Sequence, residues 1–197
     1  MPIDDSFSYE SALDQSMLLF WSRGYFNCSI SDITKTTGLN RVTIYKEFGG
    51  KEGFFLAMLQ RYRDKMTSQL FKPLQDDSSG LNAIYNFFDQ FIELSESGQL
   101  QQGCFFIATA TDLPSHPPAI QKTVNVFIEQ LTTLFTQAIK RAKMFNEISQ
   151  TLDSDTTATF FVANIFGLLS LARATNNNKL VRDQVTMLKQ WLSFHLK

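Results

Sequence analysis

The chain has 197 residues, of which 44% are hydrophobic and 19% charged, and its formal net charge is −1; this length is enough for a small domain joined to a larger one. We find no apolar run near the roughly 18 residues that cross a bilayer, and Asp4 and Asp5 stand where a signal peptide has its basic start. Cys28 and Cys104 are too few for a disulfide framework and lack metal-ligand spacing, so we expect a cytoplasmic protein with no membrane contact, metal or other cofactor.

The pattern of residues 29–48 predicts two short helices joined by a tight turn. Ser29 is a good cap for the first helix, and Asp32 occupies the reciprocal position of a capping box. Gly38 ends that helix, because glycine enters the left-handed conformation without steric cost. Asn40 is then a favourable cap for the second helix.

The second of these helices has two distinct faces. At about 100° per residue, Ile44 and Phe48 share its apolar side. Val42, Thr43 and Lys46 lie on the opposite side, where methyl groups, a hydroxyl and a cation suit base edges and phosphates of a major groove. The alternative is an ordinary amphipathic helix with a solvated polar face, since helix-turn-helix geometry also occurs in proteins that never bind nucleic acid.

The stretch from Leu13 to Leu56 resembles the N-terminal domain of the tetracycline-repressor (TetR) family of bacterial regulators. The resemblance covers about a quarter of the chain and depends on the order and spacing of its pieces. It implies an all-α homodimer that binds a palindromic double-stranded DNA operator and releases it when a small-molecule effector binds. The matching segments are A-L-D-Q-S-M-L-L-F (12–20), R-G-Y (23–25), S-I-S-D-I (29–33), T-G-L-N-R-V-T-I-Y-K-E-F (37–48) and G-G-K-E-G-F-F (49–55).

The same resemblance implies which residues contact DNA. Lys51 opens the next helix, where the positive N-terminal end also attracts a phosphate. Glu47 departs from the family, which often has histidine there, and its carboxylate would repel the DNA backbone unless it turns toward Arg41 or Lys51. The acidic first residues lack the basic arm of many members, so we expect no minor-groove contact from them. The implied DNA-contacting residues are Ile30, Asn40, Arg41, Val42, Thr43, Tyr45, Lys46 and Lys51.

Charge is distributed unevenly along the chain. Residues 20–72 carry nine lysines and arginines against four acids, a local net charge of +5, whereas residues 73–197 carry nine against eleven. A basic region on a mildly acidic body is expected when one end of a protein contacts DNA. For Arg61, Arg63 and Lys65, a solvated charged face is an equally good explanation.

Beyond residue 50 the sequence predicts helices throughout, which gives an all-α fold of about nine helices with three in the helix-turn-helix head. We expect a DNA-binding domain at 1–50 and a ligand-binding and dimerisation domain at 51–197. The later helices are expected at about 50–71, 81–97, 103–113, 116–145, 155–175 and 179–195.

The last two predicted helices carry stripes of residues at helical spacing. One stripe is small and lets another helix approach closely, and the other is apolar. Because the family dimerises through these two helices, the resemblance implies a dimer interface there; the alternative is that both stripes face their own core. The expected interface residues are Ala163, Gly167, Ser170, Ala174, Val181, Val185, Leu188 and Leu192.

Phenylalanine is unusually abundant, with 19 residues against 5 Tyr and 2 Trp. Most of these rings are expected to be plain core. In the family the effector pocket lies among the middle helices, and a pocket walled by phenylalanine suits an apolar or aromatic ligand. The candidates for ligand contact are Phe87, Phe88, Phe91, Phe105, Phe106, Thr109, Phe127 and Asn164.

The segment 102–118 resembles a subgroup of the family in which the sixth helix starts with Gly-Cys and two apolar residues and a His-Pro precedes the seventh. His116 in this segment is a candidate for a polar pocket group, a pH-sensitive hinge or an ordinary loop residue.

The sequence does not indicate an enzyme, since it lacks a Ser/His/acid arrangement, a glycine-rich phosphate loop and a metal-ligand cluster. A helical dimer that binds only proteins remains the second hypothesis.

Overall fold

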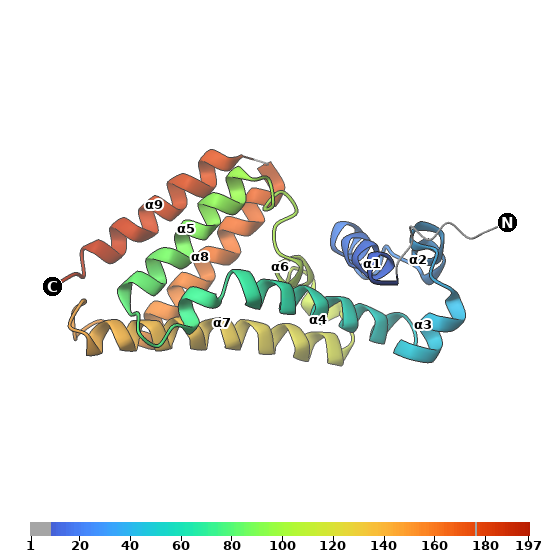
Figure 1. The fold of residues 1–197 in the computed structure, drawn as a ribbon, viewed down its shortest axis with the longest axis horizontal. Coiled ribbons are helices and arrows are strands. Elements are labelled where there is room, and N and C mark those ends of the chain that lie inside the picture. The colour runs from blue at the N-terminus through green and yellow to red at the C-terminus, as the bar shows by residue number, and fades with distance from the viewer. Residues whose placement is uncertain (1–8, 176) are drawn as a thin grey trace. The chain divides into compact units, whose positions relative to one another are not determined.

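A computed structural model describes residues 9–175 and 177–197, with the side chains of 66–68 excepted. Within these residues the chain forms nine α-helices and two short 3-10 helices and no β-strand, which confirms the predicted all-α class (Figure 1). The helices are α1 Tyr9–Arg23, α2 Ile30–Thr37, α3 Arg41–Phe48, α4 Lys51–Gln69, η1 Lys72–Gln75, α5 Leu81–Glu96, α6 Phe105–Ala110, η2 Leu113–Ser115, α7 Pro118–Met144, α8 Ser154–Thr175 and α9 Asn178–Ser193.

The chain forms two compact units. The first, here called the head, consists of the described residues up to Lys65 together with Ala108–Val124. The second, here called the body, consists of Met66–Ile107 and Asn125–Lys197. The head thus includes most of α4 and the segment that joins α6 to α7. The division into functional domains at residue 50 stays a prediction.

Local sequence rules explain the start and end of α2. The Ser29 hydroxyl accepts a hydrogen bond from the Asp32 backbone N–H at 3.1 Å, and the Asp32 carboxylate accepts one from the Ser29 N–H at 2.8 Å. Gly38 then ends the helix in the left-handed conformation, with φ of 70°. The predicted capping box and glycine stop are therefore both confirmed.

The core of the head is built from aromatic and branched side chains of α1 to α4. Phe20 of α1 packs edge-on against Phe55 of α4, with ring centroids 4.9 Å apart. Ile33 of α2 and Ile44 of α3 are fully buried. These contacts hold α3 against the other helices of the head.

Two cations of α4 pair with α1 inside the head. Arg61 Nε and Lys65 Nζ lie 2.7 and 2.6 Å from Asp14 Oδ1, and Arg61 Nη1 lies 2.7 Å from Glu10 Oε2. The hydrogen bond from Arg61, with a second from Lys65, lowers the pKa of Asp14 to about 2. This brace therefore stabilises the fold above about pH 4 and is lost as the pH falls toward the lowered pKa. The pairing favours the structural explanation for Arg61 and Lys65 over a contact with DNA.

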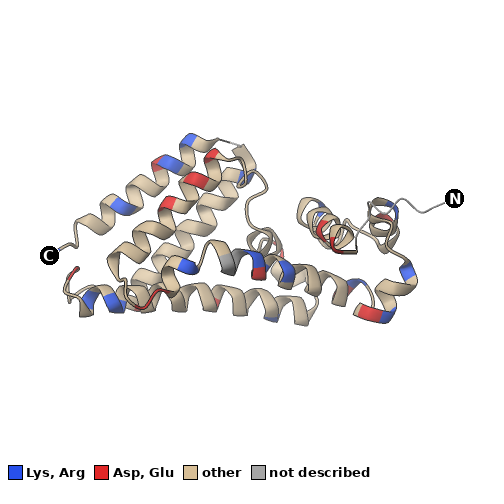
Figure 2. Ribbon diagram, in the orientation of Figure 1, with Lys and Arg blue, Asp and Glu red and all other residues tan. Residues whose placement is uncertain are grey.

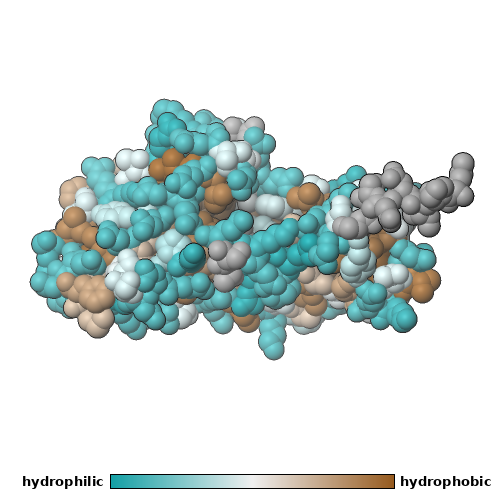
Figure 3. Space-filling view, in the orientation of Figure 1, coloured by the Kyte–Doolittle hydropathy of each residue, from teal (hydrophilic) through white to brown (hydrophobic). Residues whose placement is uncertain are grey.

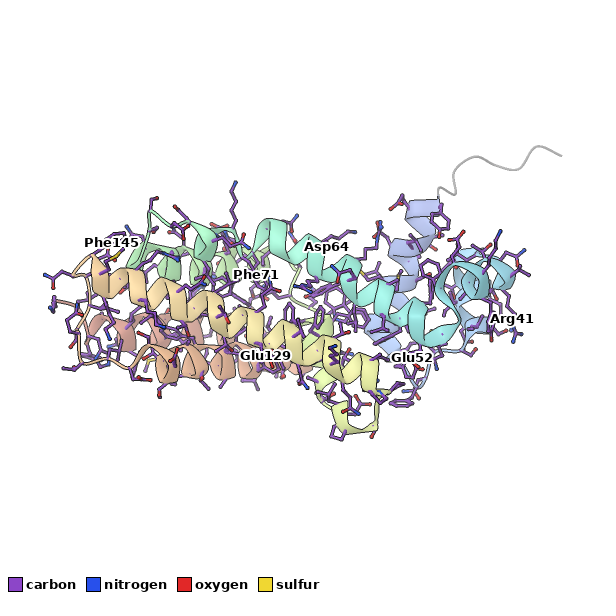
Figure 4. The ribbon with its side chains drawn as sticks, turned by 90° about the horizontal axis from the view of Figure 1, so that it is seen from below. Arg41, Glu52, Asp64, Phe71, Glu129 and Phe145 are labelled. Atoms are coloured by element: carbon purple, nitrogen blue, oxygen red, sulfur yellow. The ribbon has the colours of Figure 1, made fainter. Side chains whose placement is uncertain are left out.

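The body is a bundle in which α5, α8 and α9 lie side by side (Figure 1). Its centre is a cluster of buried phenylalanines from α5, α7 and α8. Phe87 packs against Phe135 with ring centroids 4.9 Å apart, and Phe88 packs against Phe161 at 5.4 Å. Phe71, labelled in Figure 4, adds its ring from the chain just after α4 and lies 5.8 Å from Phe127.

Helix α8 corrects one expectation from the sequence. Its 22 residues are long and apolar enough to cross a membrane by length and composition, although we expected no such run. Only one side of the helix is buried, since Phe161 and Ile165 pack in the body while Ala163, Gly167 and Ser170 are exposed. A core helix of a soluble bundle has this one-sided burial, so α8 is weak evidence for a membrane span. On the face of the molecule shown in Figure 3, most exposed residues are hydrophilic.

Candidate nucleic-acid interface

Both ends of α3 are fixed by their own sequence. The Asn40 side-chain oxygen accepts a hydrogen bond from the Val42 N–H at 2.8 Å, so Asn40 is the N-cap that the sequence predicts. Gly49 ends the helix at a φ of 74°, with its N–H bonded to the Tyr45 carbonyl. The eight residues of α3 are therefore held as one short, well-defined helix.

One face of α3 is anchored in the head. Ile44 has no exposed surface. Phe48 is half-buried and packs edge-on against Phe54 of α4, with ring centroids 4.8 Å apart. The two residues assigned to the apolar side thus contact the rest of the head, and the opposite face of α3 turns outward.

The outward face of α3 carries the side chains that the sequence assigns to DNA. Val42 is 69% exposed and Tyr45 is 49% exposed, while Arg41 and Lys46 are also at the surface. The Arg41 guanidinium lies 5.6 Å from the centre of the Tyr45 ring, a cation–π contact that groups the two side chains. Thr43 is half-buried beside them. Arg41 marks the outer edge of the head in Figure 4.

The remaining predicted DNA contacts flank this face. Ile30 is the half-buried first residue of α2. The oxygen of Asn40 accepts the capping hydrogen bond, and its amide nitrogen can donate to a base or a phosphate. Lys51 is the first residue of α4, and its ammonium group lies 4.4 Å above the Tyr25 ring. Figure 2 shows lysines and arginines along both α3 and α4.

Glu47 finds a partner that the sequence does not suggest. We expect it to turn toward Arg41 or Lys51, but the structure pairs it with Tyr9, whose hydroxyl donates a hydrogen bond to Glu47 Oε2. This hydrogen bond is the main reason that the pKa of Tyr9 rises to about 12. Tyr9 lies at the start of α1, far from Glu47 in sequence, so no local pattern could reveal the pair.

The Tyr9–Glu47 pair leads to a testable prediction. Because the carboxylate lies on the helix that is predicted to contact DNA, Glu47→Gln should tighten binding to any DNA duplex at low salt. Tyr9→Phe should weaken it, because the carboxylate is then free to approach phosphates. An exposed charge interaction is worth up to about 1 kcal/mol, which corresponds to about a fivefold change in Kd.

Fluorescence anisotropy with a labelled duplex measures both changes. In the Glu47→Gln background, Tyr9→Phe should have no effect on the Kd. An equal loss from Tyr9→Phe in both backgrounds would show that the tyrosine acts independently of the carboxylate.

The residues proposed for ligand contact are mostly part of the aromatic core of the body. Phe87, Phe88 and Phe91 of α5 belong to the cluster described above, and Phe105 of α6 is also buried. Phe106 stacks face to face on Phe127, with centroids 3.9 Å apart.

The two polar candidates are placed differently. Thr109 is buried and lies in the part of α6 that belongs to the head. Asn164 is already engaged between α8 and α9, because it accepts a hydrogen bond from Gln184 at 2.9 Å and donates one to the Phe160 carbonyl. It therefore does not join the phenylalanine cluster through these groups.

The two predicted dimer stripes differ in exposure. On α8, all four small residues are at the surface: Ala163, Gly167, Ser170 and Ala174. On α9, the apolar stripe is buried within its own subunit, with at most 3% of any side chain exposed: Val181, Val185, Leu188 and Leu192. For α9 the structure therefore favours the alternative, in which the stripe faces the core. The surface of α9 carries Leu180 and Met187 instead, at 38% and 60% exposure.

Comparison with known proteins supplies two family matches. Residues 12–58 match the model of bacterial regulatory proteins of the tetR family, and residues 80–188 match the model of the tetracyclin repressor-like C-terminal domain. The second match covers more than half of the chain.

Individual proteins similar to this chain are regulators of the same kind. The HTH-type transcriptional repressor ComR of Escherichia coli is 30% identical over 94% of this chain and 89% of its own length. A TetR transcriptional regulator from Chloroflexus aurantiacus has a TM-score of 0.84 at 25% identity, covering 95% of this chain and 94% of that one. A cysteine mutant of the regulator CifR, solved with 26-bp operator DNA, has a TM-score of 0.82 at 21% identity, covering 95% of this chain and 98% of that one.

Proposed function

The chain belongs to the TetR family of DNA-binding transcriptional regulators, and we propose that it is a cytoplasmic repressor of this kind. In this proposal it binds a palindromic operator as a homodimer and leaves the operator when a small apolar or aromatic ligand binds the body. The observation that carries the proposal is the outward face of α3, which presents Val42, Tyr45 and Lys46 while Ile44 is buried behind them.

The side chains of this face divide into base readers and backbone contacts. The Val42 methyl groups suit thymine methyls, and the Thr43 and Tyr45 hydroxyls suit the hydrogen-bonding edges of bases. Lys46 and Lys51 suit phosphates, as does the N-terminal end of α4 beside Lys51. The cap residue Asn40, Arg41 and Ile30 complete the proposed contact surface.

A two-fold dimer brings two copies of α3 to one palindrome. Both copies reach neighbouring major grooves when the half-sites lie about 34–36 Å apart. The exposed small stripe of α8 supports close approach of a second subunit, and Phe160 and Leu171 lie exposed on the same helix. We therefore assign the interface to this face of α8 and to the outer side chains of α9, such as Met187.

Ligand release follows from a difference in affinity between two states of the dimer. The phenylalanines of the body suit an apolar or aromatic effector, and Phe87, Phe106 and Phe127 are the core rings proposed to contact it. A ligand that binds more tightly to a dimer whose heads are wrongly spaced for the operator shifts the protein toward that state. The ligand can lower the affinity for DNA by no more than the ratio of its own affinities for the two states.

Two substitutions on α3 separate base reading from backbone contact. Thr43→Ala should cost about 1–3 kcal/mol on the operator but little on unrelated DNA, because it removes one base contact. Lys46→Ala should weaken binding to all sequences alike and lower the slope of log K against log salt by about one. Anisotropy titrations of each variant on operator and scrambled duplexes, at several salt concentrations, measure both effects. A change of preferred operator in Lys46→Ala would contradict its assignment to the backbone.

The protein-binding alternative makes a different prediction for the wild type. A regulator prefers its operator over scrambled DNA and loses affinity steeply with salt. A module that binds only proteins shows no sequence preference even at low salt.

A further inference from the structure

His116 is a buried histidine that the DNA-reading face does not explain. It lies in the turn between η2 and α7, within the head, and only 2% of its side chain is exposed. Gln121 holds the turn by donating a hydrogen bond to the His116 carbonyl at 2.7 Å. Burying a polar ring costs desolvation of its nitrogens, so the contacts that hold His116 in place need to be accounted for.

Three aromatic rings of the head, here called the aromatic box, enclose His116. Its ring centroid lies 4.9 Å from that of Phe26, 5.5 Å from that of Tyr25 and 6.1 Å from that of Phe55. Tyr25 and Phe26 come from the chain between α1 and α2, and Phe55 comes from α4. The histidine therefore joins the turn before α7 to both sides of the helix-turn-helix motif.

One polar atom of His116 fixes the orientation of its ring. Nε2 lies 3.0 Å from Asp112 Oδ1, one turn earlier in the chain. Nδ1 is buried and has no hydrogen-bond partner among the described residues. The ring is thus held at one edge by Asp112, and its faces are left to contact the aromatic side chains.

Tyr25 connects this aromatic box to the DNA-contacting surface. Its ring touches His116 and also carries the ammonium group of Lys51 at 4.4 Å. Lys51 has a long, flexible side chain, and holding it against a ring reduces the entropy lost when it binds a phosphate. A displaced Tyr25 ring leaves Lys51 without this support.

We propose that His116 is a positioning residue for DNA binding, which orients Tyr25 and through it holds Lys51 ready for an operator phosphate. This inference rests on the proposed function, in which Lys51 contacts DNA. The turn that carries His116 is continuous with α6 and α7, and both helices extend into the body.

A double-mutant cycle between His116 and Lys51 tests the proposal. The probe is a duplex that the full-length wild-type protein selects from a random pool, titrated by anisotropy at several salt concentrations. Lys51→Ala should lower the salt slope by about one. His116→Ala should lower it by the same amount, and in the Lys51→Ala background it should have no further effect. His116→Phe, which keeps a ring in the box, should restore the wild-type slope.

The outcomes separate the two hypotheses. If Lys51→Ala leaves the slope unchanged, the proposed phosphate contact is wrong, and the positioning role fails with it. If Lys51→Ala lowers the slope but His116→Ala weakens binding equally in both backgrounds at an unchanged slope, His116 is only structural and the inference is overturned. Should the alanine variant not fold, His116→Leu fills the box without an aromatic ring and gives the same comparison.

Discussion

Glutamate in place of Gly167 is expected to break the dimer and to abolish tight operator binding while each subunit stays folded. Gly167 lies in the middle of the exposed stripe on α8, and a Cβ atom built there meets nothing within 4 Å in its own subunit. Any residue other than glycine or proline also favours the helix, by about 0.5–1 kcal/mol for alanine. The expected loss of dimerisation and of operator binding therefore arises only where a second subunit packs on the stripe.

At that interface the substitution places a charge and added volume where two helices approach closely. An uncompensated buried charge costs about 3–5 kcal/mol, which corresponds to a loss of at least about 100-fold in affinity. A monomer also contacts only one half-site, so tight operator binding is lost when the dimer dissociates.

Sedimentation velocity measures the dimer, and fluorescence anisotropy with the operator measures DNA binding. Thr133→Glu adds the same charge at an exposed position of α7 and should leave both unchanged. A Gly167→Glu protein that remains dimeric with wild-type affinity would move the interface away from this face of α8.

Alanine in place of Gly53 should disrupt the head itself. A Cβ atom at this position lies 1.8 Å from the Phe48 carbonyl oxygen and 3.0 Å from its carbonyl carbon. Both are backbone atoms, so neither can rotate away, and the end of α3 must move relative to α4. Overpacking of this kind costs about 1–3 kcal/mol or more, and a shifted α3 no longer meets both grooves. We expect a lower melting temperature and at least about a tenfold loss of operator affinity.

Gly167→Ala is the matched control, because it is also a glycine-to-alanine change inside a helix. No atom of the same subunit lies within 4 Å of a Cβ at Gly167, so alanine there should leave the fold of the head intact, and any effect it has should arise where a second subunit packs on α8. Circular-dichroism melts compare the two variants directly. If Gly53→Ala melts at the wild-type temperature and binds the operator with wild-type affinity, the close contact between α3 and α4 does not determine the stability of the head or the position of α3.

The features that the sequence predicts well are those determined by neighbours along the chain. The capping box at Ser29, the left-handed glycine at Gly38 and the cap at Asn40 each involve residues within a few positions of one another. The same is true of the helix limits and of the burial of Ile44. Helical periodicity and capping chemistry are sufficient for all of them.

The features that the sequence misses depend on tertiary partners. The sequence predicts the apolar stripe that contains Val185 on α9 as a dimer interface, with the subunit's own core as the alternative. Periodicity alone cannot say whether the same subunit or a second one covers such a stripe, and the structure buries it within its own subunit. Tyr9 and Glu47 are distant in the chain and meet only when α1 and α3 are packed. His116 likewise joins the head only because the segment before α7 folds back to it.

The proposed function makes DNA recognition depend on the outward side chains of α3, and selection from a random pool of duplexes tests this dependence directly. The wild-type protein should enrich a palindrome whose half-sites lie about 34–36 Å apart and bind it at least about 1,000-fold tighter than scrambled DNA. A variant with Val42, Thr43 and Tyr45 all replaced by alanine should bind DNA weakly and in a salt-dependent way but enrich no palindrome. If the variant selects the same palindrome as the wild type, or if the wild type selects none, α3 is not the element that reads DNA.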